Sequence, residues 1–311
     1  MINSIEQYLA ELKKELSGSD RATIQDALSD AEEYLRTALN NAAAAGQGES
    51  QAEILKPIIE KYGAPAEVAA AYKDIESRTP PAFASTAPKE IKPRPAPDLS
   101  PVAPDTRSFI ARFFGVYAEP RAWGSLFYLL FSLATGIIYY TWAITGLSVS
   151  LGLLVLIVGL PIAGLFLLSV RGITLVEGRL VEALLGVRMP RRPLFSRKDI
   201  GWWQKFKGLI TSGRTWTALG YMILQLPLGI IYFTVFVTLI GLSVWFIGSP
   251  VWQLAVGLPI ATVYPYAYYI ASWAMPLAVI GGILLLTATM HLAKVTGKGH
   301  GRLAKALLVR E

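Results

Sequence analysis

Residues 122–170 read AWGSLFYLLFSLATGIIYYTWAITGLSVSLGLLVLIVGLPIAGLFLLSV and contain no Asp, Glu, Lys or Arg. Residues 215–293 form a second stretch without any charged side chain. A helix that crosses a bilayer needs about 20 consecutive apolar residues, so each stretch is longer than one span. The two stretches therefore predict an integral membrane protein with several membrane helices.

The composition agrees with this prediction. Only 16% of the 311 residues are charged and the mean hydropathy is +0.44, whereas soluble domains carry about 25% charged residues. Residues 1–78 hold 14 acids and 8 bases, and residues 121–311 hold 4 acids and 16 bases. Because these bases flank the apolar stretches, as in cytoplasmic loops, they favour a membrane role and argue against direct nucleic-acid binding.

Residues 1–78 predict a small cytoplasmic bundle of helices. Apolar residues recur at helical spacing on both sides of Gly18, and helices with one apolar face must pack together. These residues are Ile5, Tyr8, Leu9, Leu12 and Leu16 before the glycine, and Ile24, Leu28, Ala31, Leu35 and Leu39 after it. A third short helix is expected to end at Gly63, although Pro57 conflicts with a continuous helix and leaves its start open. Pro65 fits the first turn of a fourth helix.

The motif Tyr62-Gly63-Ala64-Pro65-x-Glu67-Val68-Ala69, together with Tyr8-Leu9-x-x-Leu12, resembles the bacterial HAAS-type signalling domain. The resemblance covers about residues 2–76, with Tyr62 and Ala64 where the family pattern has Leu and Ser. That family is linked to membrane proteins that work with PadR-type transcriptional regulators. The resemblance implies a head that binds a protein partner; the alternative is a bundle that only helps folding or assembly.

Residues 79–106 are expected to be a linker. Eight prolines fall between residues 79 and 105, and such a segment sustains neither a helix nor a central strand. It should act as a semi-extended tether. The predicted organisation is thus a helical head (1–78), a Pro-rich linker (79–106) and a membrane domain (107–311).

The membrane domain is predicted to be a tandem duplication. Residues 121–145 match residues 214–238 at 11 of 25 positions, at a constant offset of 93. Further on, Arg179-Leu180 matches Arg302-Leu303 at an offset of 123, so the second copy holds an insert near residues 249–276. We expect two parallel repeats, covering about residues 107–200 and 201–311.

The lengths of the uncharged stretches fit four spans, at about residues 123–145, 148–170, 216–240 and 271–293. A short turn at residues 145–148 is expected between the first two spans. The basic segments at the ends of each stretch should be cytoplasmic, which places both chain termini on that side of the inner or plasma membrane. The predicted fold is therefore all-α, with a helical head joined to a four-helix transmembrane domain.

Three segments that flank the spans are amphipathic and should lie at the membrane interface: residues 109–117, 173–187 and 202–210. The third combines Trp202 and Trp203 with Lys205 and Lys207. Aromatic rings beside lysines favour contact with anionic lipid headgroups.

The insert near residues 249–276 is uncharged and rich in aromatic side chains. Its candidate residues are Trp252, Tyr264, Tyr266, Tyr268 and Tyr269. Trp and Tyr are enriched where a membrane meets water, so an external interfacial anchor is the favoured interpretation. A small lid or ligand pocket is the alternative.

The membrane domain also resembles a known family. Arg-x-Trp at residue 121, LPLGIIYF at residues 226–233, Gly-Leu-Pro at residue 159 and Arg-Gly-x-x-x-x-Glu-x-Arg at residues 171–179 are similar to the bacterial putative sensor domain. The resemblance covers about residues 107–310. That family is often fused to histidine kinases, whereas no kinase signature occurs in these residues. The resemblance implies a membrane sensor but supplies neither a ligand nor functional residues.

Catalytic chemistry is not predicted. The sequence has no Cys and only two His, and it lacks the HExxH, Walker A, G-x-S-x-G and kinase signatures. We therefore expect neither enzyme activity nor a metal or other cofactor.

The favoured function is a membrane sensor or signalling protein whose head engages a regulator, and the resemblance implies a regulator of PadR type. A transport-related or membrane-organising subunit is the alternative. Since the head is acidic, it could fold back on the basic loop between the repeats. The candidate docking residues are Arg179, Arg188, Arg191 and Arg192.

The topology can be tested with reporter fusions in the full membrane domain. A fusion after Gly201 should report the cytoplasm and a fusion after Gly257 the outside, because basic segments are retained on the cytoplasmic side. Finding both reporters in the same compartment would rule out the four-span arrangement.

Overall fold

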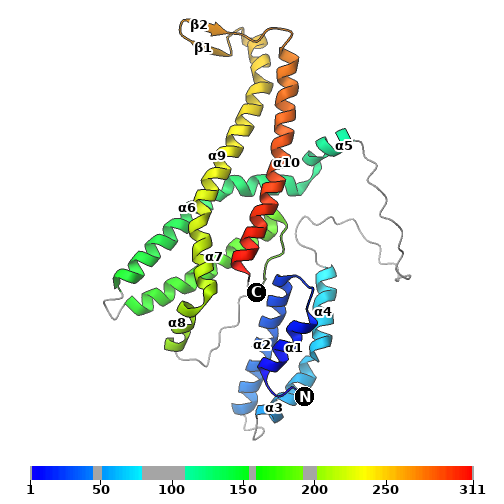
Figure 1. The fold of residues 1–311 in the computed structure, drawn as a ribbon, viewed down its shortest axis with the longest axis vertical. Helices are drawn as coiled ribbons and strands as arrows, with labels where there is room; N and C mark the ends of the chain where they lie inside the picture. Colours follow the sequence, from blue (N-terminus) through cyan, green and yellow to red (C-terminus); the bar gives the residue numbers. More distant parts are fainter. Residues whose placement is uncertain (1, 45–50, 79–108, 154–158, 192–201, 310–311) are drawn as a thin grey trace, which may run out of the picture. The chain divides into compact units, whose positions relative to one another are not determined.

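A computed structural model of the chain describes residues 2–44, 51–78, 109–153, 159–191 and 202–309. Within these residues the protein is helical apart from one small β-hairpin (Figure 1). The chain divides into two compact units. The first unit comprises residues 1–82, 141–223 and 301–311, and the second comprises residues 83–140 and 224–300.

The helical head belongs to the first unit and consists of α1 (Ile5–Glu15), α2 (Arg21–Ala44), α3 (Gln51–Tyr62) and α4 (Pro65–Arg78). Its core is formed by the apolar faces that the sequence predicts for the first two helices, with additions from α3 and α4. The fully buried members include Ile5, Tyr8, Leu12, Leu16, Ala31, Leu35, Leu55 and Ala69. The predicted small helical bundle is therefore present, and it has four helices.

Glycine ends two of these helices, as the sequence predicts. Gly18 has φ +87° and Gly63 has φ +112°, a left-handed conformation that favours glycine. Pro57 lies inside α3 without ending it. Proline cannot donate a bond to the carbonyl four residues earlier, but here that carbonyl belongs to Glu53, in the first turn. The cost therefore falls at the helix start.

The turn between α3 and α4 is tied to α1. The hydroxyl of Tyr8 donates a hydrogen bond to the carbonyl of Gly63 (2.8 Å), and the amide of Ala64 donates to Oε2 of Glu67 (3.1 Å). Burial, followed by the nearby Glu67, raises the pKa of Tyr8 to about 12, so its hydroxyl stays protonated near neutral pH. The HAAS-like motif thus supplies a capped turn that α1 can bind.

In the part of the chain that the structure describes, four helices are long and apolar enough to cross a membrane: α6 (Pro120–Leu153), α7 (Gly159–Leu185), α9 (Gly213–Val256) and α10 (Met275–Leu308). Their number agrees with the predicted spans. The predicted turn at residues 145–148 is wrong, because α6 runs through this segment to Leu153.

Gly146 explains why the predicted turn does not form. A Cβ atom on this residue would lie only 2.1 Å from the ring of Phe166 in α7. Small residues let membrane helices approach closely, and one glycine within a helix costs only about 1 kcal/mol. Gly146 therefore marks a helix contact within the first unit and not a turn.

Shorter elements flank the spans. They are α5 (Phe109–Phe114), the 3₁₀ helix η1 (Gly115–Ala118), α8 (Trp202–Thr211), and strands β1 (Ala261–Val263) and β2 (Tyr266–Tyr268). The amphipathic segment predicted at residues 173–187 is not a separate helix, because α7 continues to Leu185. No proline interrupts residues 171–185, so the helix continues past the end of the apolar stretch.

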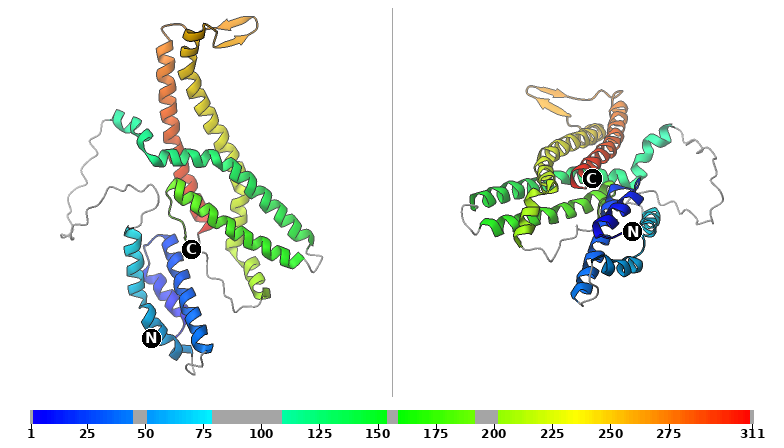
Figure 2. Two further views of the ribbon diagram at one scale, coloured as in Figure 1. Left: turned by 180° about the vertical axis from the view of Figure 1, so that it is seen from behind. Right: turned by 60° about the horizontal axis from the view of Figure 1, so that its bottom comes forward.

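The second unit holds α9 from Leu224 onward, the hairpin and most of α10. Figure 2 shows α9 and α10 side by side, with the hairpin at their shared end. The strands are antiparallel and pair Ala261 with Tyr268. The side-chain amide of Gln253 forms two hydrogen bonds with the backbone of Ile270. Its oxygen accepts from the Ile270 amide (2.8 Å), and its nitrogen donates to the Ile270 carbonyl (2.9 Å). These two hydrogen bonds connect the end of α9 to the segment between β2 and α10.

Replacing Tyr8 with Phe should loosen the head, because it removes the hydroxyl that binds Gly63. The expected cost is about 1 kcal/mol, so hydrogen exchange of protected amides in α1 and α4 should accelerate about fivefold in the full chain. Tyr34→Phe is a matched control, because Tyr34 stacks on Tyr62 with ring centroids 4.7 Å apart and the variant keeps its ring. Equal acceleration in both variants would contradict the role of the Tyr8 hydroxyl.

Candidate functional site

The N-terminal end of α2 carries the first candidate contact of the head. Asp20 caps this helix by accepting a hydrogen bond from the amide of Ala22 (2.8 Å). Its other oxygen, Oδ2, forms an ion pair with the ammonium group of Lys305, near the end of α10. The side chains of Asp20 and Lys305 are only 27% and 20% exposed. Asp20 therefore joins the head to the C-terminal part of the first unit.

A second contact lies six residues further along α2. The backbone amide of Arg191 donates to both carboxylate oxygens of Asp26, at 2.9 and 3.0 Å. Asp26 is only 6% exposed. Hydrogen bonds to a charged acceptor are stronger than neutral ones, so this carboxylate holds the segment that follows α7.

Three of the predicted docking arginines are gathered around a nearby carboxylate, that of Glu182. Glu182 lies 2.8 Å from Nη2 of Arg191, 3.4 Å from Nη1 of Arg188 and 3.6 Å from Nη1 of Arg179. The Arg179 guanidinium also donates to the carbonyl of Arg191 (2.7 Å). Arg192 lies outside the described residues. Hence the guanidinium groups shape the segment after α7, and the head reaches that segment through a backbone amide.

Sequence reasoning did not identify Asp20, Asp26 and Lys305 as contact residues. The signal for Lys305 was its place in the basic segment near the C-terminal end, and the signal for Asp20 was its place as a helix cap. Nothing in the sequence pointed to the amide of Arg191, because backbone donors carry no residue signature.

The face of α2 around these contacts is polar and nevertheless buried. Thr23, Gln25 and Ser29 are 2%, 5% and 5% exposed, although none of them belongs to the apolar core of the head. Polar contact surfaces are typical of domains that separate and reassociate, whereas permanent interfaces are more apolar. The head therefore has an apolar core and a separate polar contact face.

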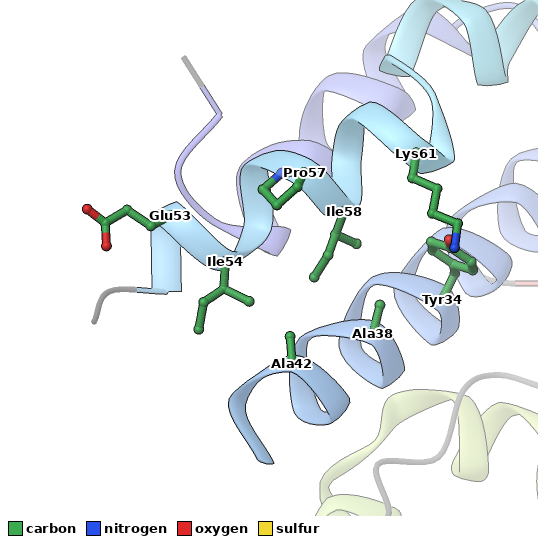
Figure 3. Close-up of a pocket in the computed structure, with 8 residues that line it drawn as sticks. All are labelled: Tyr34, Ala38, Ala42, Glu53, Ile54, Pro57, Ile58 and Lys61. Carbon is green, nitrogen blue, oxygen red and sulfur yellow. The ribbon is translucent and has the colours of Figure 1, made fainter. Parts of the chain in front are cut away.

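The head also has an apolar groove, which lies between α2 and α3. In Figure 3, Ile54 and Ile58 of α3 point toward α2, where Ala38 and Ala42 lie. The groove has a volume of about 370 Å³. A neighbouring hollow of about 430 Å³ shares Tyr34 and Ala38 and adds acidic side chains of α2.

Tyrosine contacts connect α2 to α3 and α4 beside this groove. Tyr62 stacks on Tyr34, and Tyr72 donates a hydrogen bond to Asp30 (2.8 Å). Burial raises the pKa of Tyr62, and the nearby Asp30 raises it further. The Tyr62 hydroxyl therefore stays neutral near neutral pH and does not repel that carboxylate.

The predicted lipid-binding residues lie on α8, where two of their side chains are described. Trp203 is 58% exposed and Lys207 is exposed, whereas Phe206 and Leu209 are buried. Trp202 and Lys205 lie in the same helix, and their side chains fall outside the described part of the chain. One face of α8 is thus buried against the protein and the other is exposed, and lipid binding stays a prediction.

The aromatic residues of the insert lie at the end of α9 and in the hairpin segment. All of them are at least half exposed: Trp252 54%, Tyr264 99%, Tyr266 68%, Tyr268 50% and Tyr269 57%. A nearby pocket of about 380 Å³ is lined by Trp245, Trp252 and the small residues of α9. The anchor and the ligand pocket both stay predictions.

No group of three or more His, Asp or Glu residues that could hold a metal ion occurs in the part of the chain that the structure describes.

Comparison with known families agrees with this architecture. Residues 128–308 match the family described as "Putative sensor", and residues 7–71 match the family described as HAAS. No curated protein and no solved structure matches the chain. The first match covers more than half of the chain and includes all or most of the four long apolar helices. The chain therefore belongs to the "Putative sensor" family and carries an N-terminal HAAS domain.

Proposed function

We propose that the protein is a membrane sensor whose cytoplasmic head alternates between two states. In one state α2 rests on the segments that follow α7 and end α10; in the other it is released to bind a regulator. The polar contact face around Asp20 and Asp26 carries this proposal. Both chain termini are cytoplasmic in this scheme, as the distribution of basic residues favours.

The contact is strong enough to form and weak enough to break. An ion pair near the surface contributes at most about 1 kcal/mol, and a hydrogen bond to a charged group contributes about 1.5–3 kcal/mol. The tether of residues 79–106 keeps the head near its site, at an effective concentration that reaches the millimolar range. A change of a few kcal/mol in the membrane helices would then redistribute the two states.

The partner surface that we propose is the groove between α2 and α3. The groove is lined mainly by apolar side chains and by Glu53, and Glu33 lines the neighbouring hollow. An apolar groove with acidic surroundings fits an amphipathic segment with basic flanks. The link between HAAS domains and PadR-type regulators makes such a regulator the partner that we propose.

Release of the head can be measured by cysteine labelling, because the chain has no natural cysteine. A single cysteine at Thr23 should react slowly with a maleimide in membranes, since this position is 2% exposed. Combining Thr23→Cys with Asp26→Ala and Lys305→Gln removes both contacts. We expect labelling to accelerate at least tenfold, because the loss should exceed about 1.4 kcal/mol.

Two controls distinguish release from unfolding. Ala31→Cys reports the core of the head and should stay protected in the same background, because Ala31 is 0% exposed. Glu11→Gln removes one acidic charge from an exposed position of α1 and should leave labelling at residue 23 unchanged. Unchanged labelling in the double variant, or equal labelling of residues 23 and 31, would contradict the two-state head.

A further inference from the structure

Helices α6 and α9 touch backbone to backbone at two glycines of the second unit. A Cβ atom on Gly136 would lie 2.8 Å from the carbonyl oxygen of Gln225 and 3.0 Å from Cα of Leu226. A Cβ atom on Gly229 would lie 2.5 Å from the carbonyl oxygen of Ser132 and 2.9 Å from Cα of Leu133. Neither position has room for a side chain, because the obstructing atoms belong to the opposite backbone.

These two contacts are reciprocal. Adding the repeat offset of 93 to Gly136, Ser132 and Leu133 gives Gly229, Gln225 and Leu226. The glycine of each helix therefore touches the same two positions of the other helix. Such reciprocity defines an isologous contact, in which a surface binds a second copy of itself about a two-fold axis.

A second pair of contacts, made by tyrosines, follows the same rule. In the second unit the Tyr128 hydroxyl lies 2.8 Å from Nε2 of His300. In the first unit the Tyr221 hydroxyl donates to Oε1 of Glu177 at 2.6 Å. Tyr221 is 93 residues after Tyr128, and His300 is 123 residues after Glu177, so both repeat offsets are obeyed. Each tyrosine thus bonds to the equivalent position of the other repeat, and all four residues are at most 2% exposed.

Local geometry agrees between the repeats as well. The indole of Trp123 donates to the carbonyl of Tyr117 (2.9 Å), and the indole of Trp216 donates to the carbonyl of Ile210 (2.8 Å). Donors and acceptors are both 93 residues apart. The two tryptophans are 51% and 53% exposed. Equivalent residues therefore occupy equivalent surroundings.

From these reciprocal contacts we infer that the membrane domain is an internal two-fold pair, in which the surface of α6 centred on Gly136 binds the equivalent surface of α9 centred on Gly229. The partner of each repeat is a second copy of the same repeat, supplied by the same chain. This inference does not depend on the proposed function of the head.

Cross-linking in the full, naturally cysteine-free chain tests the two-fold relation. The pair Leu133→Cys with Ile230→Cys and its equivalent, Leu226→Cys with Ile137→Cys, place one cysteine beside each glycine contact. A short bismaleimide in membranes should join both pairs with efficiencies within about twofold of each other, as an isologous contact requires. Leu133→Cys with Leu242→Cys is the control, because Leu242 lies more than three turns beyond Gly229 on α9, and it should not cross-link. Cross-linking of only one equivalent pair, or of neither, overturns the inference.

Glycine variants give a second measurement. Gly136→Leu and Gly229→Leu should both lower the thermal stability of the purified chain, and by similar amounts. Gly152→Leu in α6 and Gly220→Leu in α9 should have little effect, because no atom lies within 4 Å of a Cβ at either position. A loss confined to one of the two crossing glycines contradicts the reciprocal contact.

The polar pairs allow an exchange experiment. Glu177→Leu and His300→Leu should each destabilise the chain, since each removes a hydrogen-bond partner of a buried tyrosine hydroxyl. The exchanged double variant, Glu177→His with His300→Glu, should recover most of that loss, because each position then receives the side chain found at its equivalent. A double variant as unstable as the two leucine variants combined counts against equivalent positions.

Discussion

The absence of side chains at Gly136 and Gly229 is the constraint on which the membrane domain depends. Lipid gives apolar helices no hydrophobic reason to associate, so close packing and polar contacts must hold them together. At this crossing, within the second unit, the backbones of α6 and α9 are near enough for many van der Waals contacts. The uncharged stretches supply no ion pair at membrane depth, and the tyrosine hydroxyls supply the directional bonds. Packing and a few buried hydrogen bonds thus hold the membrane helices together, whereas a hydrophobic core holds the head together.

The head and the number of spans could be predicted from sequence because their signals are local. Ile5, Tyr8 and Leu12 repeat at helical spacing, and Gly18 and Gly63 punctuate the chain where the backbone turns. Gly146 was misinterpreted because glycine has two meanings: it permits a turn, and it permits two helices to touch. Only the position of Phe166, which is distant in sequence, decides between them.

The sequence could predict that the head is attracted to the basic segments, but not which donor and acceptor groups form the contact. An acidic head and basic loops suggest attraction, and Arg188 and Arg191 were reasonable candidates on that ground. Glu182 lies close to both in sequence and takes their guanidinium groups, so what remains for Asp26 is a backbone amide. An amide is present at every residue except proline, and only the fold shows which one is exposed to a carboxylate. The same holds for Lys305, which lies 285 residues from its partner Asp20.

The reciprocal crossing has an evolutionary consequence. A protein with a single repeat would have to form this contact with a second chain. Every mutation would then occur in both chains, on both sides of the two-fold axis. When both copies lie in one chain, each can mutate without the other changing. One half can keep Glu177 while the other acquires His300, and one half alone can carry a hairpin. A single head can likewise be attached to an assembly that would otherwise have two. In the internal two-fold pair that we infer, the two halves of one scaffold are thus free to specialise.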